Sequence, residues 1–158
     1  MMDLFSDLVH ILKQKKYHIT SAESCTAGMF CSHLADVPGA SDVLAFGFVV
    51  YSEEAKCSVL GVHPETIALY GVVSEETARE MVVGAAARSG AEIGVSFTGF
   101  AGPGDDPTVG KVCFGFYLSG KTISKTVRFG NIGRNLVREK AAAFAAAELL
   151  KFLEAESC

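Results

Sequence analysis

The segment TSAESCTAGMF, residues 20–30, carries a density of polar and reactive side chains that does not suit a buried core. Four of its residues bear hydroxyl groups, one bears a carboxylate and one a thiol, and the segment leads into apolar positions spaced as in a helix. Its candidate nucleophiles are Ser21, Ser24, Cys25 and Thr26. A hydroxyl group attacks at neutral pH only when a base accepts its proton. The segment therefore predicts nucleophilic chemistry that depends on a base from elsewhere in the chain.

Lysine is the base that the rest of the sequence favours. The four histidines stand in no motif that suggests a Ser-His-Asp arrangement. Lys56, within VVYSEEAKCSV, comes at the start of an expected helix directly after an apolar strand. Partial burial there would lower the pKa of Lys56 and allow its amine to accept a proton. Tyr51, at the end of the same strand, could share or relay that proton.

A second junction, VSFTGFAGPGDD at residues 95–106, has the composition of a ligand-binding loop. Gly99, Gly102 and Gly104 allow the backbone to approach a ligand closely. In open α/β sheets, ligands gather where strands end and helices begin, because loops converge there and helix N-termini offer unpaired N–H groups. Neither junction contains a G-x-x-x-x-G-K-[ST] motif or a complete dinucleotide fingerprint, which argues against kinase-like and Rossmann-type sites.

Structural interpretations of the same residues are open on spacing alone. Ser24 or Thr26 can serve simply as a helix N-cap. Lys56 can be a solvated helix residue paired with Glu53, and the glycines can serve turns alone. Residue types and spacing do not decide between these interpretations and a catalytic one.

Alternating helices and strands must position these residues. Apolar spacing predicts helices over residues 3–17, 26–37, 52–61, 74–90 and 134–153, and runs of β-branched and aromatic residues predict strands over 18–22, 43–51, 92–100, 111–119 and 121–129. Ser74 is the expected N-cap of the fourth helix, Gly90 its stop, and Gly120 the turn of a hairpin. We expect one α/β domain over residues 1–158, a three-layer α/β/α sandwich with a mixed β-sheet.

Composition and charge restrict the classes of function. A chain of 158 residues that is 49% apolar can bury its own core without staples. Its net charge of −4 argues against a nucleic-acid backbone as the main partner, although local basic patches are compatible with it. The first residues do not resemble a secretory leader, and the apolar runs are too short to span a bilayer. We therefore expect a cytoplasmic protein with neither a membrane nor a direct nucleic-acid partner.

The cysteines show no paired spacing. They are Cys25, Cys31, Cys57, Cys113 and Cys158. An odd number of cysteines in a reducing compartment predicts free thiols. Cys25 and Cys31 fit buried small apolar residues better than metal ligands, because no C-x-x-C or H-E-x-x-H pattern accompanies them. We therefore predict no metal site.

Several segments together resemble a known family. They are AESCTAG, FGFVVYSEEAK, LGV, GVVSEETAREM, SFTGFAGPGD, VGKV and GRNLVRE, in this order over nearly the whole chain. In these motifs the chain resembles the C-terminal domain of the competence/damage-inducible protein CinA. Stand-alone members of that family are nicotinamide-nucleotide amidases of the PncC type, which convert nicotinamide mononucleotide to nicotinate mononucleotide and ammonia. The resemblance thus implies an amidohydrolase that acts on this small molecule without a cofactor.

The resemblance also implies roles for individual residues. Ser24 matches the family's serine nucleophile, Lys56 the lysine that activates it, and Tyr51 the tyrosine of the same segment. The implied substrate-binding residues are Cys25, Thr26, Gly28, Thr98, Gly99, Gly102, Arg134 and Arg138. Either of the two arginines could hold the substrate phosphate through a bidentate contact. The family usually has two glycines after the threonine of the first motif, and here Ala27 takes the place of the first.

Residues and resemblance together predict a Ser-Lys mechanism. Ser24 attacks the amide carbon, Lys56 takes its proton and passes it to the departing ammonia, and water then hydrolyses the acyl-enzyme. Backbone N–H groups near Cys25 and Thr26, at the expected start of the second helix, would stabilise the oxyanion.

One alternative function is a pyridine-nucleotide-binding or regulatory module with little or no chemistry, linked to competence or DNA damage. Binding of a pyridine nucleotide without release of ammonia would distinguish it. Members of the family are commonly oligomeric, and we expect a homodimer in which the apolar, Ala-rich last helix supplies a flat self-complementary face.

Overall fold

The computed structural model describes residues 1–156, which form one five-stranded sheet and the helices around it. The strands are β1 (Ile19–Glu23), β2 (Leu44–Val49), β3 (Ile93–Gly99), β4 (Lys111–Leu118) and β5 (Lys121–Arg128). The helices are α1 (Met2–Lys15), α2 (Met29–Ala35), α3 (Glu53–Leu60), α4 (Pro64–Tyr70), α5 (Glu75–Ser89), α6 (Arg134–Ala155) and a short 3-10 helix, η1 (Ala40–Asp42).

The sheet is mixed, with the strand order β2-β1-β3-β4-β5. β1 runs parallel to both β2 and β3, whereas β4 and β5 extend the sheet as an antiparallel hairpin. At the end of β1, Glu23 pairs with Val49 of β2 and with Phe97 of β3. The carboxyl ends of three parallel strands therefore lie together at one edge of the sheet, where loops can build a site.

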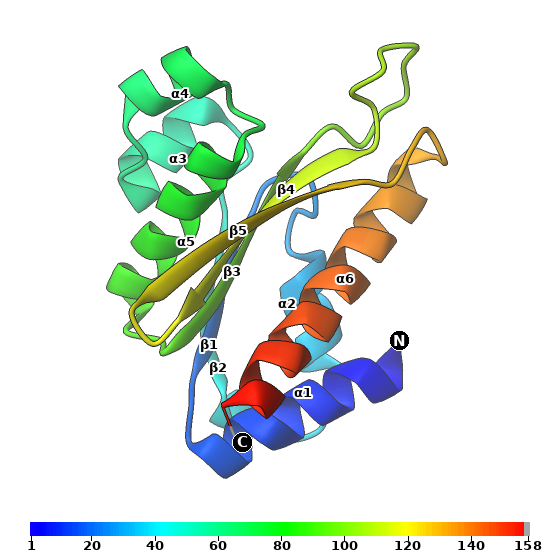
Figure 1. Ribbon diagram of the computed structural model, residues 1–158. Helices are drawn as coiled ribbons and strands as arrows, with labels where there is room; N and C mark the ends of the chain where they lie inside the picture. The colour runs from blue at the N-terminus through cyan, green and yellow to red at the C-terminus, as the bar shows by residue number, and fades with distance from the viewer. Residues whose placement is uncertain (157–158) are drawn as a thin grey trace.

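Helices cover both faces of the sheet (Figure 1). α5 lies across one face with α3 and α4 beside it, and α1, α2 and α6 cover the other. The larger apolar core lies between the sheet and the second group of helices, and it contains a series of phenylalanine rings in contact: Phe5, Phe30, Phe97, Phe114 and Phe116. This architecture confirms the expected three-layer α/β/α sandwich with a mixed sheet.

Local signals in the sequence explain most element boundaries. The Ser74 hydroxyl accepts a hydrogen bond from the Thr77 N–H at the start of α5, and Gly90 ends this helix in the left-handed conformation, as expected. The second helix was expected from residue 26, but α2 begins at Met29 because residues 24–28 form a turn. α4 was not expected, since it is short and buries no residue completely.

The Ala-rich face of α6 is not available for self-association. Ala141, Ala142, Ala145 and Ala146 are fully buried in the larger core, where α6 packs against α1 and the sheet. The expectation that this face forms a dimer interface is therefore wrong, because small side chains here serve close packing within one chain. The homodimer itself stays a prediction.

Two further expectations concern membranes and thiols. In residues 1–156, no helix has the length and apolar character needed to cross a membrane. Cys25, Cys31, Cys57 and Cys113 are free thiols, as expected. Cys158 lies outside the described residues.

Candidate active site

The predicted nucleophile and base meet at the carboxyl edge of the parallel strands. Ser24 directly follows β1, and Lys56 lies on α3, which follows β2. The Lys56 Nζ donates a hydrogen bond to the Ser24 Oγ over 2.9 Å. It also contacts the carbonyl oxygens of Val50 at 2.9 Å and Tyr51 at 3.4 Å. The Ser52 hydroxyl accepts a hydrogen bond from the Ala55 N–H and so caps the start of α3. With the helix beginning here, the Lys56 side chain points inward.

Burial controls the charge of Lys56. Its side chain is among the largest that are fully buried, with the residue only 1% exposed. Desolvation lowers the pKa of Lys56 below its ordinary value, while the nearby Cys25, Glu53 and Cys57 oppose this shift. Lys56 forms no ion pair with Glu53 in the described part of the chain. The solvated-lysine interpretation is therefore wrong, and an amine with a lowered pKa can accept the Ser24 proton.

The other candidate nucleophiles are less suitable than Ser24. Burial raises the pKa of the Cys25 thiol to about 11, so the reactive thiolate is scarce at neutral pH. The Ser21 hydroxyl is fully buried and donates to Glu23, and Thr26 is also fully buried. Only Ser24 combines partial exposure with a contact to a base.

Residues 24–28, here called the 24–28 turn, place Ser24 between β1 and α2. The Ser24 N–H donates to the Phe97 carbonyl of β3, and the Ala27 N–H donates back to the Ser24 carbonyl. Neither Ser24 nor Thr26 caps α2, whose N-cap is Gly28 without a side-chain contact. Within residues 1–156, the backbone N–H groups of Cys25 and Thr26 have no acceptor on another residue. These two groups therefore lack a protein acceptor in this part of the chain, and they precede the helix rather than start it.

Glu23 organises this turn, a role that was not predicted from the sequence. Its carboxylate is buried, with the residue 1% exposed. It accepts hydrogen bonds from the backbone N–H groups of Gly28, Phe30 and Cys31 and from the Ser21 hydroxyl. A carboxylate in the middle of a reactive segment was a possible signal, but only the folded backbone shows that it binds N–H groups at the end of the turn and in the first residues of α2.

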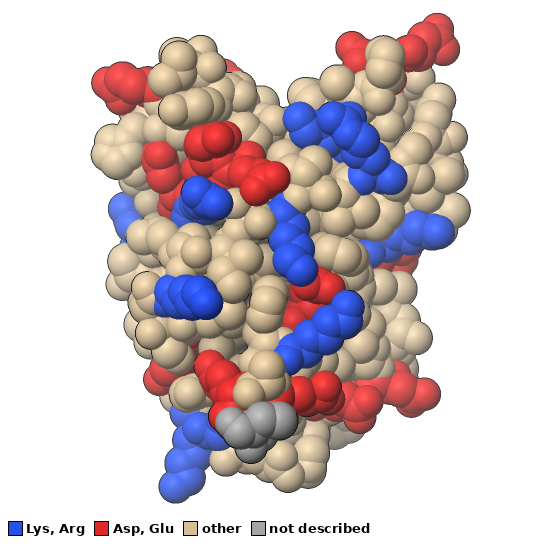
Figure 2. Space-filling model, in the orientation of Figure 1, with Lys and Arg blue, Asp and Glu red and all other residues tan. Residues whose placement is uncertain are grey.

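A cavity of about 640 Å³ opens beside the Ser24–Lys56 pair, within the usual size range of small-molecule sites. The space-filling view is hollowed at its upper edge, between the lobe of α3 and α4 and the lobe formed by loop 100–110 and the start of α6 (Figure 2). The predicted site residues that line the cavity are Ser24, Cys25, Tyr51, Lys56, Thr98, Gly99, Gly102 and Arg134. Thr26, Gly28 and Arg138 do not line it.

Arg134 and Tyr51 meet at the outer part of this cavity. Tyr51 is 57% exposed, and its hydroxyl accepts a hydrogen bond from the Arg134 Nη2 at 2.7 Å. The Arg134 Nη1 donates to the Gly102 carbonyl at 2.6 Å. In the described residues, the Tyr51 hydroxyl forms no hydrogen bond with Lys56 or Ser24, and it is the Tyr51 carbonyl that accepts from the amine. The expected proton relay through this hydroxyl is therefore not supported by the geometry.

Arg138, one helical turn further along α6, points to the 24–28 turn instead. Its Nε donates to the Cys25 carbonyl at 2.9 Å and its Nη2 to the Thr26 carbonyl at 3.1 Å. The two late arginines thus have different surroundings, since Arg134 lines the cavity and Arg138 binds backbone beside it.

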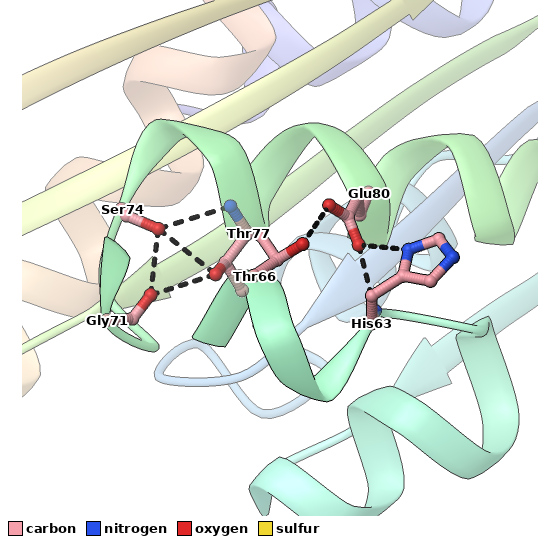
Figure 3. A network of polar contacts seen from close by, with 6 residues as sticks. All are labelled: His63, Thr66, Gly71, Ser74, Thr77 and Glu80. Carbon is pink, nitrogen blue, oxygen red and sulfur yellow. Dashed lines mark hydrogen bonds and ion pairs between the residues drawn. The ribbon is translucent and has the colours of Figure 1, made fainter. Parts of the chain in front are cut away.

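One part of the cavity wall is formed by residues 72 and 73, which connect α4 to α5. The Gly71 carbonyl accepts hydrogen bonds from the Ser74 and Thr77 hydroxyls, and Glu80 of α5 accepts from His63 and Thr66 at the start of α4 (Figure 3). These contacts hold both α4 and the connection that follows it against α5.

Thr98 holds the same wall from the sheet. Its hydroxyl donates to the Val72 carbonyl at 2.8 Å, so its proton stabilises the cavity wall while the residue lines the cavity. Among the described residues, no three His, Cys, Asp or Glu side chains gather as ligands for a metal ion.

Ala27 lies in the left-handed region with φ = 48°, but it is exposed and does not line the cavity. The methyl group therefore does not narrow the site. Because a non-glycine residue in this region is strained by about 1–2 kcal/mol, we expect Ala27→Gly to raise the free energy of unfolding by about 0.5–1 kcal/mol after the entropic cost of glycine. Urea unfolding of both proteins measures this change, and a destabilised variant would contradict it.

Comparisons with known proteins agree with this architecture. The family model described as CinA C-terminal domain matches residues 2–153. A CinA-like protein from Kosmotoga olearia is 45% identical over 141 residues, which cover 87% of this chain and 34% of that protein. The chain thus spans about a third of the length of the curated relatives it matches.

Solved structures of similar length resemble this chain over nearly all of its residues. A competence damage-inducible protein A from Klebsiella pneumoniae is 34% identical and has a TM-score of 0.93, with 97% of this chain and 96% of that chain covered. A competence or damage-inducible protein from Enterobacter asburiae is 37% identical with a TM-score of 0.92, and the similarity covers 96% and 97% of the two chains.

Proposed function

The chain belongs to the family of the CinA C-terminal domain, and on this premise we propose that it is an amidohydrolase that converts nicotinamide mononucleotide to nicotinate mononucleotide and ammonia. The observation that carries the proposal is the contact of 2.9 Å between the buried Lys56 amine and the Ser24 hydroxyl at the floor of a cavity. A lysine placed in this way is an activating base for a hydroxyl nucleophile.

Ser24 and Lys56 perform the acylation step. The neutral Lys56 amine takes the Ser24 hydroxyl proton while the Ser24 Oγ attacks the carboxamide carbon. The tetrahedral intermediate collapses as Lys56 returns that proton to the departing nitrogen, which leaves as ammonia. The product of this step is an ester between Ser24 and the nicotinoyl group of the mononucleotide.

Water completes the reaction by the same route in reverse. Lys56 takes a proton from water, whose oxygen attacks the ester carbon, and the proton then returns to the Ser24 oxygen as the nicotinate product leaves. The N–H group of Cys25, which lines the cavity and has no acceptor on another residue within residues 1–156, is the candidate oxyanion donor. One such donor is worth about 2.7–4 kcal/mol of transition-state stabilisation in serine hydrolases.

Arg134 is the phosphate-binding residue in this proposal. Among the described residues, it is the only arginine that lines the cavity, and its guanidinium is held by the Tyr51 hydroxyl and the Gly102 carbonyl. A guanidinium presents several donors to a phosphate in a fixed geometry. Glycines at 99 and 102 bring backbone to the cavity wall without side chains. The reaction needs no cofactor.

Substitution of Arg134 should weaken binding of the nucleotide selectively. In the Ser24→Ala background, we expect Arg134→Gln to raise the Kd for nicotinamide mononucleotide by about 10- to 100-fold, because a charge-assisted contact to the phosphate is lost. The Kd for nicotinamide riboside, which lacks the phosphate, should change by less than about 3-fold. Calorimetric titration measures both constants, and an equal loss for the two ligands would exclude Arg134 as the phosphate-binding residue.

Product analysis tests the proposed reaction itself. Incubation of the purified protein with nicotinamide mononucleotide should yield nicotinate mononucleotide and ammonia in equal amounts, measured by chromatography and by an ammonia assay. Calorimetric binding of the nucleotide without product would favour the regulatory binding module instead. The absence of both binding and product would exclude both functions.

A further inference from the structure

Two charged residues outside the cavity hold the backbone that carries Ser24. We propose that Glu23 and Arg138 are positioning residues, which bind backbone groups in and directly after the 24–28 turn and keep the Ser24 Oγ against the Lys56 amine. This inference rests on the proposed hydrolysis and extends it to residues that do not line the cavity.

Glu23 fixes the two ends of the turn relative to each other. It is the last residue of β1, and its Oε1 accepts from the N–H groups of Gly28 at 3.1 Å and Phe30 at 3.0 Å. Its Oε2 accepts from the Cys31 N–H at 3.2 Å and from the Ser21 hydroxyl at 2.8 Å. A buried carboxylate is costly unless such donors satisfy it, so all four contacts hold the side chain in one place.

Arg138 binds the middle of the turn through its backbone carbonyl groups. Its Nε and Nη2 bind the carbonyls of Cys25 and Thr26, and its Nη1 donates to Asn135 on the same helix at 3.3 Å. The planar guanidinium makes two contacts at a fixed spacing, which a lysine cannot reproduce. Glu23 thus accepts hydrogen bonds from N–H groups of one short segment, and Arg138 donates hydrogen bonds to carbonyl groups of the same segment.

Because peptide groups are planar, the Arg138 contacts also fix the direction of the Thr26 N–H. In a trans peptide, the carbonyl of one residue and the N–H of the next point in opposite directions. Because the Cys25 carbonyl points to Arg138, the Thr26 N–H points away from it. The Thr26 carbonyl also points to Arg138, and the Ala27 N–H accordingly turns back to the Ser24 carbonyl at 3.0 Å. Arg138 therefore sets the direction of the Thr26 N–H, which is unpaired within the described residues.

The turn needs such external contacts because its own conformation is not a relaxed one. Ala27 and Gly28 both have positive φ, at 48° and 93°. A turn with a strained alanine relaxes when its contacts are removed. A displacement of the nucleophile by about 1 Å can cost about 10²-fold in rate without any change in the ligand contacts.

Kinetics of Arg138→Gln and Glu23→Gln separate positioning from binding. We expect kcat for nicotinamide mononucleotide to fall by about 10- to 100-fold in each variant, with KM within about 2-fold of the parent. Arg138→Lys, which can hold one carbonyl but not two, should give an intermediate kcat. Arg88→Gln on α5 and Glu148→Gln on the far part of α6 are matched controls outside the 24–28 turn, and both should retain the parent kcat.

A readout that does not need the substrate makes the result independent of the proposed function. The rate at which a fluorophosphonate labels Ser24, followed by intact mass, should fall in parallel with kcat in the Arg138 and Glu23 variants. Labelling of the parent at Ser24 without release of ammonia would overturn the proposed function. The positioning roles would then be tested by comparing the labelling rates of the parent and the variants.

Three outcomes would overturn the positioning roles. They are a folded Arg138→Gln protein with the parent kcat and labelling rate, an increase in KM alone, and a parent whose Ser24 is not labelled. Should Glu23→Gln fail to fold, the Arg138 variants decide, because Arg138 is only partly buried on the surface of α6.

Discussion

Replacement of Ser24 by alanine is expected to lower kcat for nicotinamide mononucleotide by about 10⁴-fold or more. Loss of the nucleophile in a hydrolase of this type removes the covalent step, and what remains is the smaller acceleration from binding and oxyanion donors. The Ser24 side chain makes its hydrogen bond only to Lys56 in the described residues. The variant should therefore fold, with a free energy of unfolding within about 1.5 kcal/mol of the parent.

Ser58→Ala is the matched control for this variant. Ser58 lies exposed on α3, the helix that carries Lys56, and does not line the cavity. It should keep the parent kcat. Circular dichroism and thermal unfolding show whether each variant is folded, and a folded Ser24→Ala protein with undiminished turnover would exclude Ser24 as the nucleophile.

Replacement of Lys56 by methionine is expected to lower kcat by a similar factor of about 10⁴, because no other base contacts Ser24 in the described part of the chain. Methionine keeps much of the apolar volume of a side chain that is fully buried. Lys140→Met, on the exposed side of α6, is the control for loss of a lysine and should keep the parent kcat. Substantial turnover by folded Lys56→Met would show that another group accepts the proton.

The pH dependence of the parent should follow the ionisation of Lys56. Only the neutral amine can accept the Ser24 proton, so kcat/KM should rise with pH as Lys56 loses its proton. Desolvation lowers the pKa of Lys56, and this rise should therefore be centred below the ordinary lysine value of 10.5. A rate that falls with pH across this range would contradict the assignment of Lys56 as the base.

The same shift predicts how stability changes with pH. Between the lowered pKa of folded Lys56 and the ordinary value of 10.5, the unfolded chain binds more protons than the folded protein. The contribution of Lys56 to the free energy of unfolding should therefore increase as pH rises through this window. Lys56→Met should lack that increase when urea unfolding of the two proteins is compared across the window.

Local patterns in the sequence indicated four candidate nucleophiles and one candidate base, Lys56, but did not decide between a catalytic and a structural role. The resemblance to a known family singled out Ser24, and the structure places its hydroxyl 2.9 Å from the Lys56 amine. The sheet and its flanking helices followed from apolar spacing, and caps such as Ser74 and Gly90 marked their ends. These signals act over short stretches of chain, so no knowledge of tertiary contacts was needed.

The supporting contacts were not accessible in the same way. Arg138 binds carbonyls more than 100 residues earlier in the chain, and the sequence could not separate its surroundings from those of Arg134. Glu23 interacts with backbone N–H groups that become neighbours only when residues 24–28 turn. The Ala-rich face of α6 was misread because small residues suit an interface between chains and a tight core equally well.

The most direct test of a Ser-Lys amidase is the release of ammonia from nicotinamide mononucleotide by four folded proteins measured side by side. They are the parent, Ser24→Ala, Lys56→Met and the Ser58→Ala control. The account predicts release by the parent and the control, and loss of release in the two site variants. Undiminished release by either site variant, or no release by the parent, would contradict it.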